Sequence, residues 1–151
     1  MAQLGVGIIG CGNISTAYCT LAPMFKSLSV KAVADINMDA ARARAAEFGL
    51  RAEKVAALLK APDIDVIVNL PIPEVHFAVT KQILEAGKHA YSEKPLVLTL
   101  AEGEELREIA AAKGLRVGAA PDTFLGGAHH QARAAIDAGE ISIVDEAYTD
   151  G

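Results

Sequence analysis

The feature of this sequence that most restricts its fold is a regular alternation of short apolar runs with helical stretches. Short runs of Val, Ile, Leu and Ala are typical of strands that are buried on both faces of a sheet. The runs predicted to be strands are 4–9, 30–34, 50–52, 65–70, 89–91 and 115–119. Strands that alternate with helices pair in parallel, so the sequence predicts an α/β fold: a doubly wound, mostly parallel sheet with helices on both faces.

Local signals place the ends of two of the longer helices. Asn37 is a favourable N-cap, and Gly49 can end the following helix. Thr99 and Glu102 have the spacing of a capping box, in which each side chain accepts a hydrogen bond from the other residue's amide. With Gly114 as the end of that second helix, these signals predict helices between Asn37 and Gly49 and between Thr99 and Gly114.

Composition excludes several classes of protein. The 151 residues are 52% hydrophobic, and 14 Lys and Arg against 19 Asp and Glu give a formal net charge of −5. This apolar content argues against disorder. The acidic balance argues against nucleic acid or an anionic membrane surface as a partner, and no apolar run approaches the roughly 20 residues of a membrane span. Any anionic ligand must therefore be bound locally.

The cysteines and histidines give weaker signals. Cys11 and Cys19 have neither metal-ligand spacing nor the density of a disulfide scaffold, and the first basic residue is Lys26, so a secretory leader is missing and a cytoplasmic location is predicted. Cys11 either fills a glycine turn as a small residue or, at the positive end of a helix, has a lowered pKa. His129 and His130 are adjacent and point apart on a helix, so we predict no metal site.

A glycine motif follows the first predicted strand directly and opens the first predicted helix. Gly10 and Gly12 allow a tight turn and let a pyrophosphate lie close to the backbone amides at the positive end of the helix. Ser15 replaces the third glycine of the usual fingerprint with another small residue. The motif predicts a Rossmann-type nucleotide site in which Gly10, Gly12, Asn13 and Ile14 contact the cofactor.

An acidic residue stands at the end of the second predicted strand. The carboxylate of Asp35 can accept hydrogen bonds from a ribose diol and would repel a 2′-phosphate, which favours NAD over NADP. The more distant Arg42 and Arg44 do not clearly form a 2′-phosphate site. The alternative is structural: the glycines serve only a tight turn, and Asp35 only caps the next helix.

Three further segments follow predicted strands, at the edge where an open parallel sheet binds ligands: 69–76, 92–96 and 120–127. Lys94 is the chemical candidate, because an ammonium beside a nicotinamide could bind a substrate hydroxyl and favour its deprotonation. The alternative is that Lys94 only pairs with Glu93 at the surface.

These motifs together resemble the glucose-fructose oxidoreductase, inositol dehydrogenase and rhizopine catabolism (Gfo/Idh/MocA) family of nicotinamide-dependent oxidoreductases. The resemblance rests on the glycine loop and on the segments 33–35, 63–65, 71–76, 86–89 and 93–95, of which Glu93-Lys94-Pro95 is the most specific. It implies that Lys94 assists hydride transfer between nicotinamide and a sugar-like or polyol hydroxyl. It also implies that Glu93 and Pro71 lie near the cofactor, and it maps His76 onto a family histidine for which a structural role is an equal alternative.

The resemblance also defines the expected domain organisation. Residues 1–121 are predicted to be the NAD(P)-binding domain, and 122–151 a connecting loop, a helix and the first strand, near 143–149, of a substrate domain that this chain lacks. In the family that second domain builds the substrate pocket and the subunit interface, so the full-length protein is expected to be a homo-oligomer. Segment 121–127 departs from the common Arg-Phe version of its loop, which leaves the substrate subclass open.

Three hypotheses follow from the sequence. The first is the nucleotide-binding part of an NAD-dependent oxidoreductase, with Lys94 at the reacting hydroxyl. The second is a non-catalytic dinucleotide-binding or redox-sensing module that is inactive alone. The third is a structural or interaction protein on an inherited fold, which binds no nucleotide.

Overall fold

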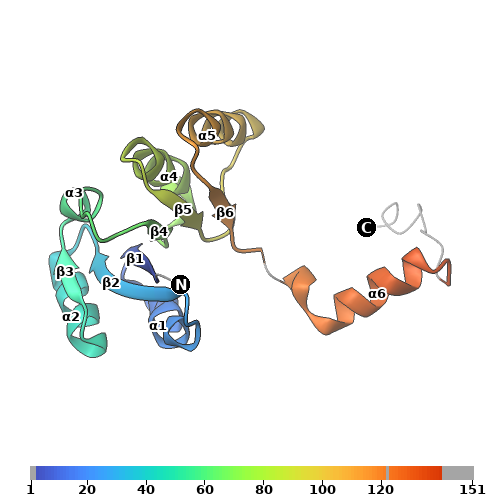
Figure 1. Cartoon of the computed structure of the whole chain (residues 1–151), viewed down its shortest axis with the longest axis horizontal. Helices are drawn as coiled ribbons and strands as arrows, with labels where there is room; N and C mark the ends of the chain where they lie inside the picture. The colour runs from blue at the N-terminus through green and yellow to red at the C-terminus, as the bar shows by residue number, and fades with distance from the viewer. Residues whose placement is uncertain (1–2, 122, 141–151) are drawn as a thin grey trace. The chain divides into compact units, whose positions relative to one another are not determined.

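A computed structural model describes residues 3–121 and 123–140 of the chain. Its centre is a six-stranded sheet with the order β3-β2-β1-β4-β5-β6, in which every neighbouring pair is parallel (Figure 1). The strands are β1 (Leu4–Ile9), β2 (Leu28–Ala34), β3 (Arg51–Glu53), β4 (Val66–Asn69), β5 (His89–Ser92) and β6 (Val117–Ala119). The predicted doubly wound parallel sheet is confirmed.

The strand order places one reversal of direction beside β1. The chain runs outward from β1 through β2 to β3, then crosses to β4 on the other side of β1 and continues outward to β6. The segments that leave the carboxyl ends of β1 and β4 lead to helices on opposite faces of the sheet, α1 on one face and α4 on the other. In sheets of this kind, ligands bind at this switch point.

Helices connect the strands, and two of them end as their local sequence predicts. The helices of this part are α1 (Asn13–Leu21), α2 (Met38–Phe48), α3 (Val55–Leu58), α4 (His76–Glu85) and α5 (Leu100–Lys113), with short 3-10 turns η1 (Ala22–Met24) and η2 (Pro73–Val75). The Asn37 side chain accepts from two amides of the first turn of α2, and Gly49 ends that helix with φ 66°. Thr99 and Glu102 form the capping box of α5, and Gly114 follows with φ 66°.

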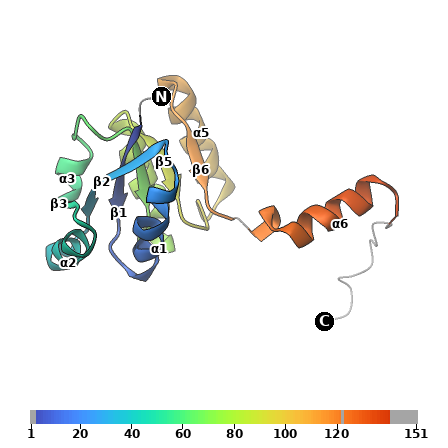
Figure 2. The same cartoon turned by 60° about the horizontal axis from the view of Figure 1, so that its bottom comes forward.

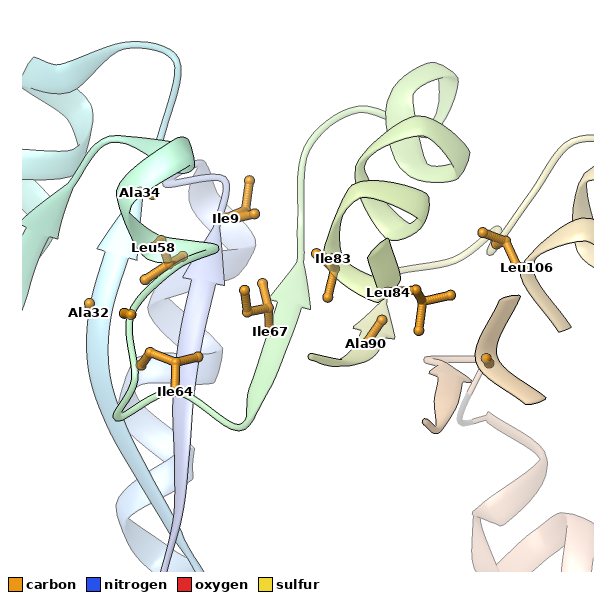
Figure 3. Close-up of a cluster of buried hydrophobic side chains, with 12 residues drawn as sticks. Ile9, Ala32, Ala34, Leu58, Ile64, Ile67, Ile83, Leu84, Ala90 and Leu106 are labelled. Carbon is orange, nitrogen blue, oxygen red and sulfur yellow. The ribbon is translucent and has the colours of Figure 1, made fainter. Parts of the chain in front are cut away.

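The helices cover both faces of the sheet because successive strand residues point to opposite faces. On one face Ile9, Ile67 and residues of β2 pack against α3, α4 and α5 (Figure 3). On the other face Ile8, Val33 and their neighbours pack against α1 and α2. Figure 2 shows α1 and α2 beside β1 to β3, and α5 beside β6.

Strand boundaries differ from the prediction by one or two residues in every strand except β1, and the largest differences are at the starts of β2 and β6. Strand β2 begins at Leu28, because Leu28 pairs with Leu4 at the start of β1. Strand β6 begins only at Val117, because the amide of Leu115 donates to the Ala110 carbonyl 2.8 Å away and so belongs to the turn that ends α5.

Residues from 121 onward belong to a second unit, of which the structure describes 121 and 123–140. This described part contains a 3-10 turn η3 (Thr123–Leu125) and helix α6 (Gly127–Asp137), which has Gly126 as its N-cap and is followed by Gly139 with φ 73°. The strand predicted near 143–149 lies outside the described residues. In the part of the chain that the structure describes, no helix is long and apolar enough to cross a membrane.

Helix α5 offers a matched test of the core. Leu106 is 0% exposed in the cluster under α3, α4 and α5, whereas Leu100 on the same helix is 80% exposed. We expect Leu106→Ala to lower the free energy of unfolding by about 3 kcal/mol, because it removes buried methyl groups and leaves a cavity. Leu100→Ala should change it by less than about 0.5 kcal/mol. Urea unfolding measures both, and equal losses would contradict this packing.

Candidate nucleotide-binding site

Gly10 directly follows β1, at a position where only glycine fits. Its φ is +99°, a conformation that side chains rarely adopt, and a Cβ there would lie 2.8 Å from the Leu70 carbonyl carbon and the Pro71 nitrogen. Its amide donates to the Ala34 carbonyl at the end of β2, 2.9 Å away. The loop after β1 is therefore held against the loop after β4 and the end of β2 at once.

Gly12 is different, because nothing in the protein itself requires a glycine there. It is the N-cap of α1 with φ −71°, and a Cβ on it would have no atom within 4 Å. At a helix N-terminus the first amides have no intrahelical partner, which here applies to Asn13 and Ile14, and the first turn of α1 carries no acidic residue. Such a positive and unobstructed helix end fits a phosphate group, which needs close approach to the backbone.

The residues that follow Gly12 divide between the protein interior and the surface. Asn13 and Ile14 are exposed at the start of α1, beside Gly12. Ser15 is completely buried, and its hydroxyl donates to the Gly12 carbonyl 2.6 Å away. Ser15 therefore packs in the interior as the small residue at this place in the motif.

Asp35 lies directly after β2, and two backbone amides hold its carboxylate. Oδ2 accepts from the amide of Cys11 at 2.7 Å, and Oδ1 accepts from the amide of Asn37 at 2.8 Å. Each carboxylate oxygen has a further lone pair, so the group can still accept from a ligand hydroxyl. The next residue, Ile36, is 99% exposed and offers an apolar surface beside this acid.

Glu93 and Lys94 follow β5. The Glu93 carboxylate accepts from the Tyr18 hydroxyl of α1 at 2.9 Å and from the backbone amide of Lys94 at 3.0 Å. Glu93 thus contacts the main chain of Lys94, and the described residues contain no ion pair between the two side chains. The Lys94 ammonium is on an exposed residue at the carboxyl edge of the sheet.

His76 joins the loops after β4 and β5 from the start of α4. The residue is 1% exposed, with Nδ1 2.6 Å from the Pro95 carbonyl oxygen and Nε2 3.0 Å from the Pro71 carbonyl oxygen. The side-chain amide of buried Asn69 donates to the His76 carbonyl at 3.0 Å. Both ring nitrogens thus face protein atoms, so any effect of His76 on a cofactor passes through the loops that it joins.

Sequence analysis did not single out Tyr18 or Arg44 as site residues. Tyr18 has the helical spacing of a core residue, and only the fold shows that its hydroxyl reaches Glu93. Arg44 contacts Glu47 and the Gly12 carbonyl, whereas Arg42 pairs with Asp39 at the surface. No local signal in the sequence marks these contacts.

Metal ligands do not gather in the described part of the chain. Within residues 3–121 and 123–140, no three His, Cys, Asp or Glu side chains are placed to hold an ion. His129 and His130 are exposed on α6.

Cys11 is buried, and its thiol donates to the Ala34 carbonyl 3.6 Å away. Burial, followed by the negative charge of Asp35, raises the pKa of Cys11 to about 11. Burial also raises the pKa of Cys19. The structure thus favours a filling role for Cys11 over the alternative of a lowered pKa, because burial and the Asp35 charge raise the pKa.

The raised pKa makes Cys11 a poor nucleophile, since only the thiolate reacts. In a Cys19→Ala variant, we expect iodoacetamide at pH 8 to modify Cys11 at least about tenfold more slowly than free cysteine. The rate should rise as the pH approaches about 11, where the thiolate forms. Mass spectrometry follows the modification, and rapid labelling of the folded chain at pH 8 would contradict this account.

Comparison with known proteins identifies the family. The model of the Gfo/Idh/MocA oxidoreductase family, with its NAD-binding Rossmann fold, matches residues 4–120. The chain belongs to this family, as the motifs predicted.

Individual relatives are sugar or polyol oxidoreductases by name. A dTDP-3,4-didehydro-2,6-dideoxy-alpha-D-glucose 3-reductase of Streptomyces violaceoruber is 37% identical over 150 residues, which cover 93% of this chain and 42% of that protein. An inositol 2-dehydrogenase of Klebsiella pneumoniae is 38% identical over 107 residues, 67% of this chain and 31% of the relative. This chain thus spans less than half the length of these relatives.

Two solved structures have a similar fold over most of this chain. The 3-ketoreductase KijD10 of Actinomadura kijaniata, in complex with NADP and TDP-benzene, has a TM-score of 0.83 and 29% identity, over 93% of this chain and 44% of that one. A biliverdin reductase of Synechocystis, in complex with biliverdin and NADP+, has a TM-score of 0.79 and 28% identity, over 89% of this chain and 43% of that one.

Proposed function

We propose that this chain is the nucleotide-binding part of an NAD-dependent oxidoreductase that acts on a sugar-like or polyol hydroxyl. The observation that carries the proposal is Gly12, a glycine that neither its own conformation nor its packing requires, at the positive end of α1. A diphosphate bound against the backbone at this position would explain why the residue is a glycine. Gly10, Asn13 and Ile14 complete the loop that would hold it.

Asp35 is the residue that we assign to the adenosine ribose. Its carboxylate is fixed by two amides and keeps acceptor capacity for a hydroxyl pair. The same charge would repel a 2′-phosphate, and Arg42, tied to Asp39, supplies no compensating cation. These contacts support NAD rather than NADP, although named relatives include NADP complexes.

Lys94 is the residue that we assign to the reacting hydroxyl. Bound NAD+ would supply the chemistry of accepting a hydride from the substrate carbon. The Lys94 ammonium would bind the hydroxyl oxygen and stabilise the negative charge that develops on it, while the hydroxyl proton passes to water. Glu93 orients the Lys94 backbone, Pro71 lines the facing loop, and His76 holds the two loops together.

The remaining parts of the proposal concern the surroundings of this site. We infer a cytoplasmic protein whose full-length form has a further substrate domain after residues 122–151 and assembles as a homo-oligomer. The acidic composition supports a small-molecule substrate and no nucleic-acid partner. We assign cofactor binding to the sheet domain, because Gly12, Asp35 and Lys94 all lie within residues 1–121.

NADH titration tests the cofactor site. We expect Gly12→Ala and Asp35→Ala each to weaken NADH binding about tenfold, the first by blocking the phosphate and the second by removing charged hydrogen bonds. Glu104→Ala, on an exposed residue of α5, should change it less than about twofold. Nicotinamide fluorescence measures the affinities, and NADPH should bind more weakly than NADH. Equal effects of Asp35→Ala and Glu104→Ala would refute the assigned role of Asp35.

Substrate turnover tests Lys94. With NAD+ and a polyol such as myo-inositol, we expect Lys94→Ala to lower the rate of NADH formation about 100-fold or more while NADH affinity stays within about threefold. Lys81→Ala, which removes an ammonium paired with Glu105 away from the loops, is the matched control. These rates are measured on the full-length protein, because this chain spans less than half the length of its relatives. NADH binding without polyol turnover by that protein would favour the non-catalytic module instead.

A further inference from the structure

Arg44 of α2 is a charged side chain that is largely enclosed beside α1. Only 14% of the side chain is exposed, and its guanidinium carbon lies 6.0 Å from the centre of the Phe48 ring. Nη1 pairs with Glu47 at 2.6 Å and Nη2 donates to the Gly12 carbonyl at 3.3 Å. Its Nε atom is buried without a hydrogen-bond partner among the described residues.

Packing alone gives no reason for an arginine at this position. Enclosing a guanidinium with one N–H unpaired costs free energy, whereas a Met or Leu side chain would fill the same space without that cost. The side chain therefore points to a role in the contact that it does make with the glycine loop.

The acceptor in that contact is the Gly12 carbonyl oxygen. It accepts from Arg44 Nη2, from the Ser15 amide at 3.1 Å and from the Ser15 hydroxyl at 2.6 Å. Among the described residues the cis peptide bond is Lys94–Pro95, so the Gly12–Asn13 bond is trans. In a trans peptide the carbonyl and the following N–H point in opposite directions. Holding the Gly12 carbonyl inward therefore turns the Asn13 amide outward.

Gly12 lies at the N-terminus of α1, and a Cβ added to it would meet no atom within 4 Å, so a ligand can approach this peptide closely. We propose that Arg44 is a positioning residue for diphosphate binding: it fixes the Gly12–Asn13 peptide so that the Asn13 amide faces the ligand. The Arg44 charge also lies behind that peptide, but Glu47 offsets it, so orientation is its main contribution. This inference rests on the proposed function.

The test compares ligands that share adenosine but differ in the diphosphate. We expect Arg44→Met to weaken NADH and ADP-ribose about tenfold and adenosine less than about twofold, because adenosine does not reach the loop. Arg44→Lys, which keeps a cationic donor, should be intermediate. Arg42→Met is the matched control on the same helix, and it should change every affinity by less than about twofold.

Two measurements give the affinities, fluorescence for NADH and 1H–15N NMR titration for ADP-ribose and adenosine. The NMR spectra and urea unfolding also show whether each variant is folded. If Arg44→Met does not fold, Arg44→Lys is compared with the unaltered chain instead. Equal losses for adenosine and NADH would show a merely structural role and overturn the inference, as would unchanged NADH binding by both Arg44 variants. Failure of the unaltered chain to bind NADH or ADP-ribose would instead overturn the proposed function itself.

Discussion

The close approach of the loops after β1 and β4 is the constraint on which the site depends. Gly10 lies against the Leu70–Pro71 peptide with a positive φ, so any side chain there would separate the two loops. Since β1 and β4 are neighbours at the reversal of strand order, this contact lies where sheets of this kind bind ligands. The His76 ring extends this contact, because its two nitrogens lie beside the carbonyl oxygens of Pro71 and Pro95. The loop that contains Lys94 is thereby linked to the loop after β4.

The fold could be predicted from the sequence because its signals are local. Asn37, Gly49 and the Thr99–Glu102 pair each act within one helical turn, and the structure shows these contacts as expected. Strand ends were predicted less well, because they depend on a partner. Leu28 joins β2 only because Leu4 lies opposite it, and no periodicity within the segment contains that information.

The same distinction separates the predicted site residues from those that were missed. The glycines, Asp35 and Lys94 belong to short motifs after strands, whereas Tyr18 and Arg44 reach loops that are distant in the sequence. Where two effects shift a pKa in opposite directions, only the structure shows which of them is larger. A helix end lowers a thiol pKa, but the burial of Cys11 is the larger effect and raises it.

A chain with a net charge of −5 can attract a dianionic cofactor only if its positive groups are concentrated. The glycine loop meets this requirement with backbone amides, whose partial charges need no side chain and cost no ordering when a ligand binds. The nearby acid, Asp35, would oppose a phosphate, yet its carboxylate already accepts from the amides of Cys11 and Asn37 at the end of β2. The proposed site thus uses backbone amides after β1 for the diphosphate and a fixed carboxylate after β2 for the ribose, so the ends of two neighbouring strands contribute opposite charges.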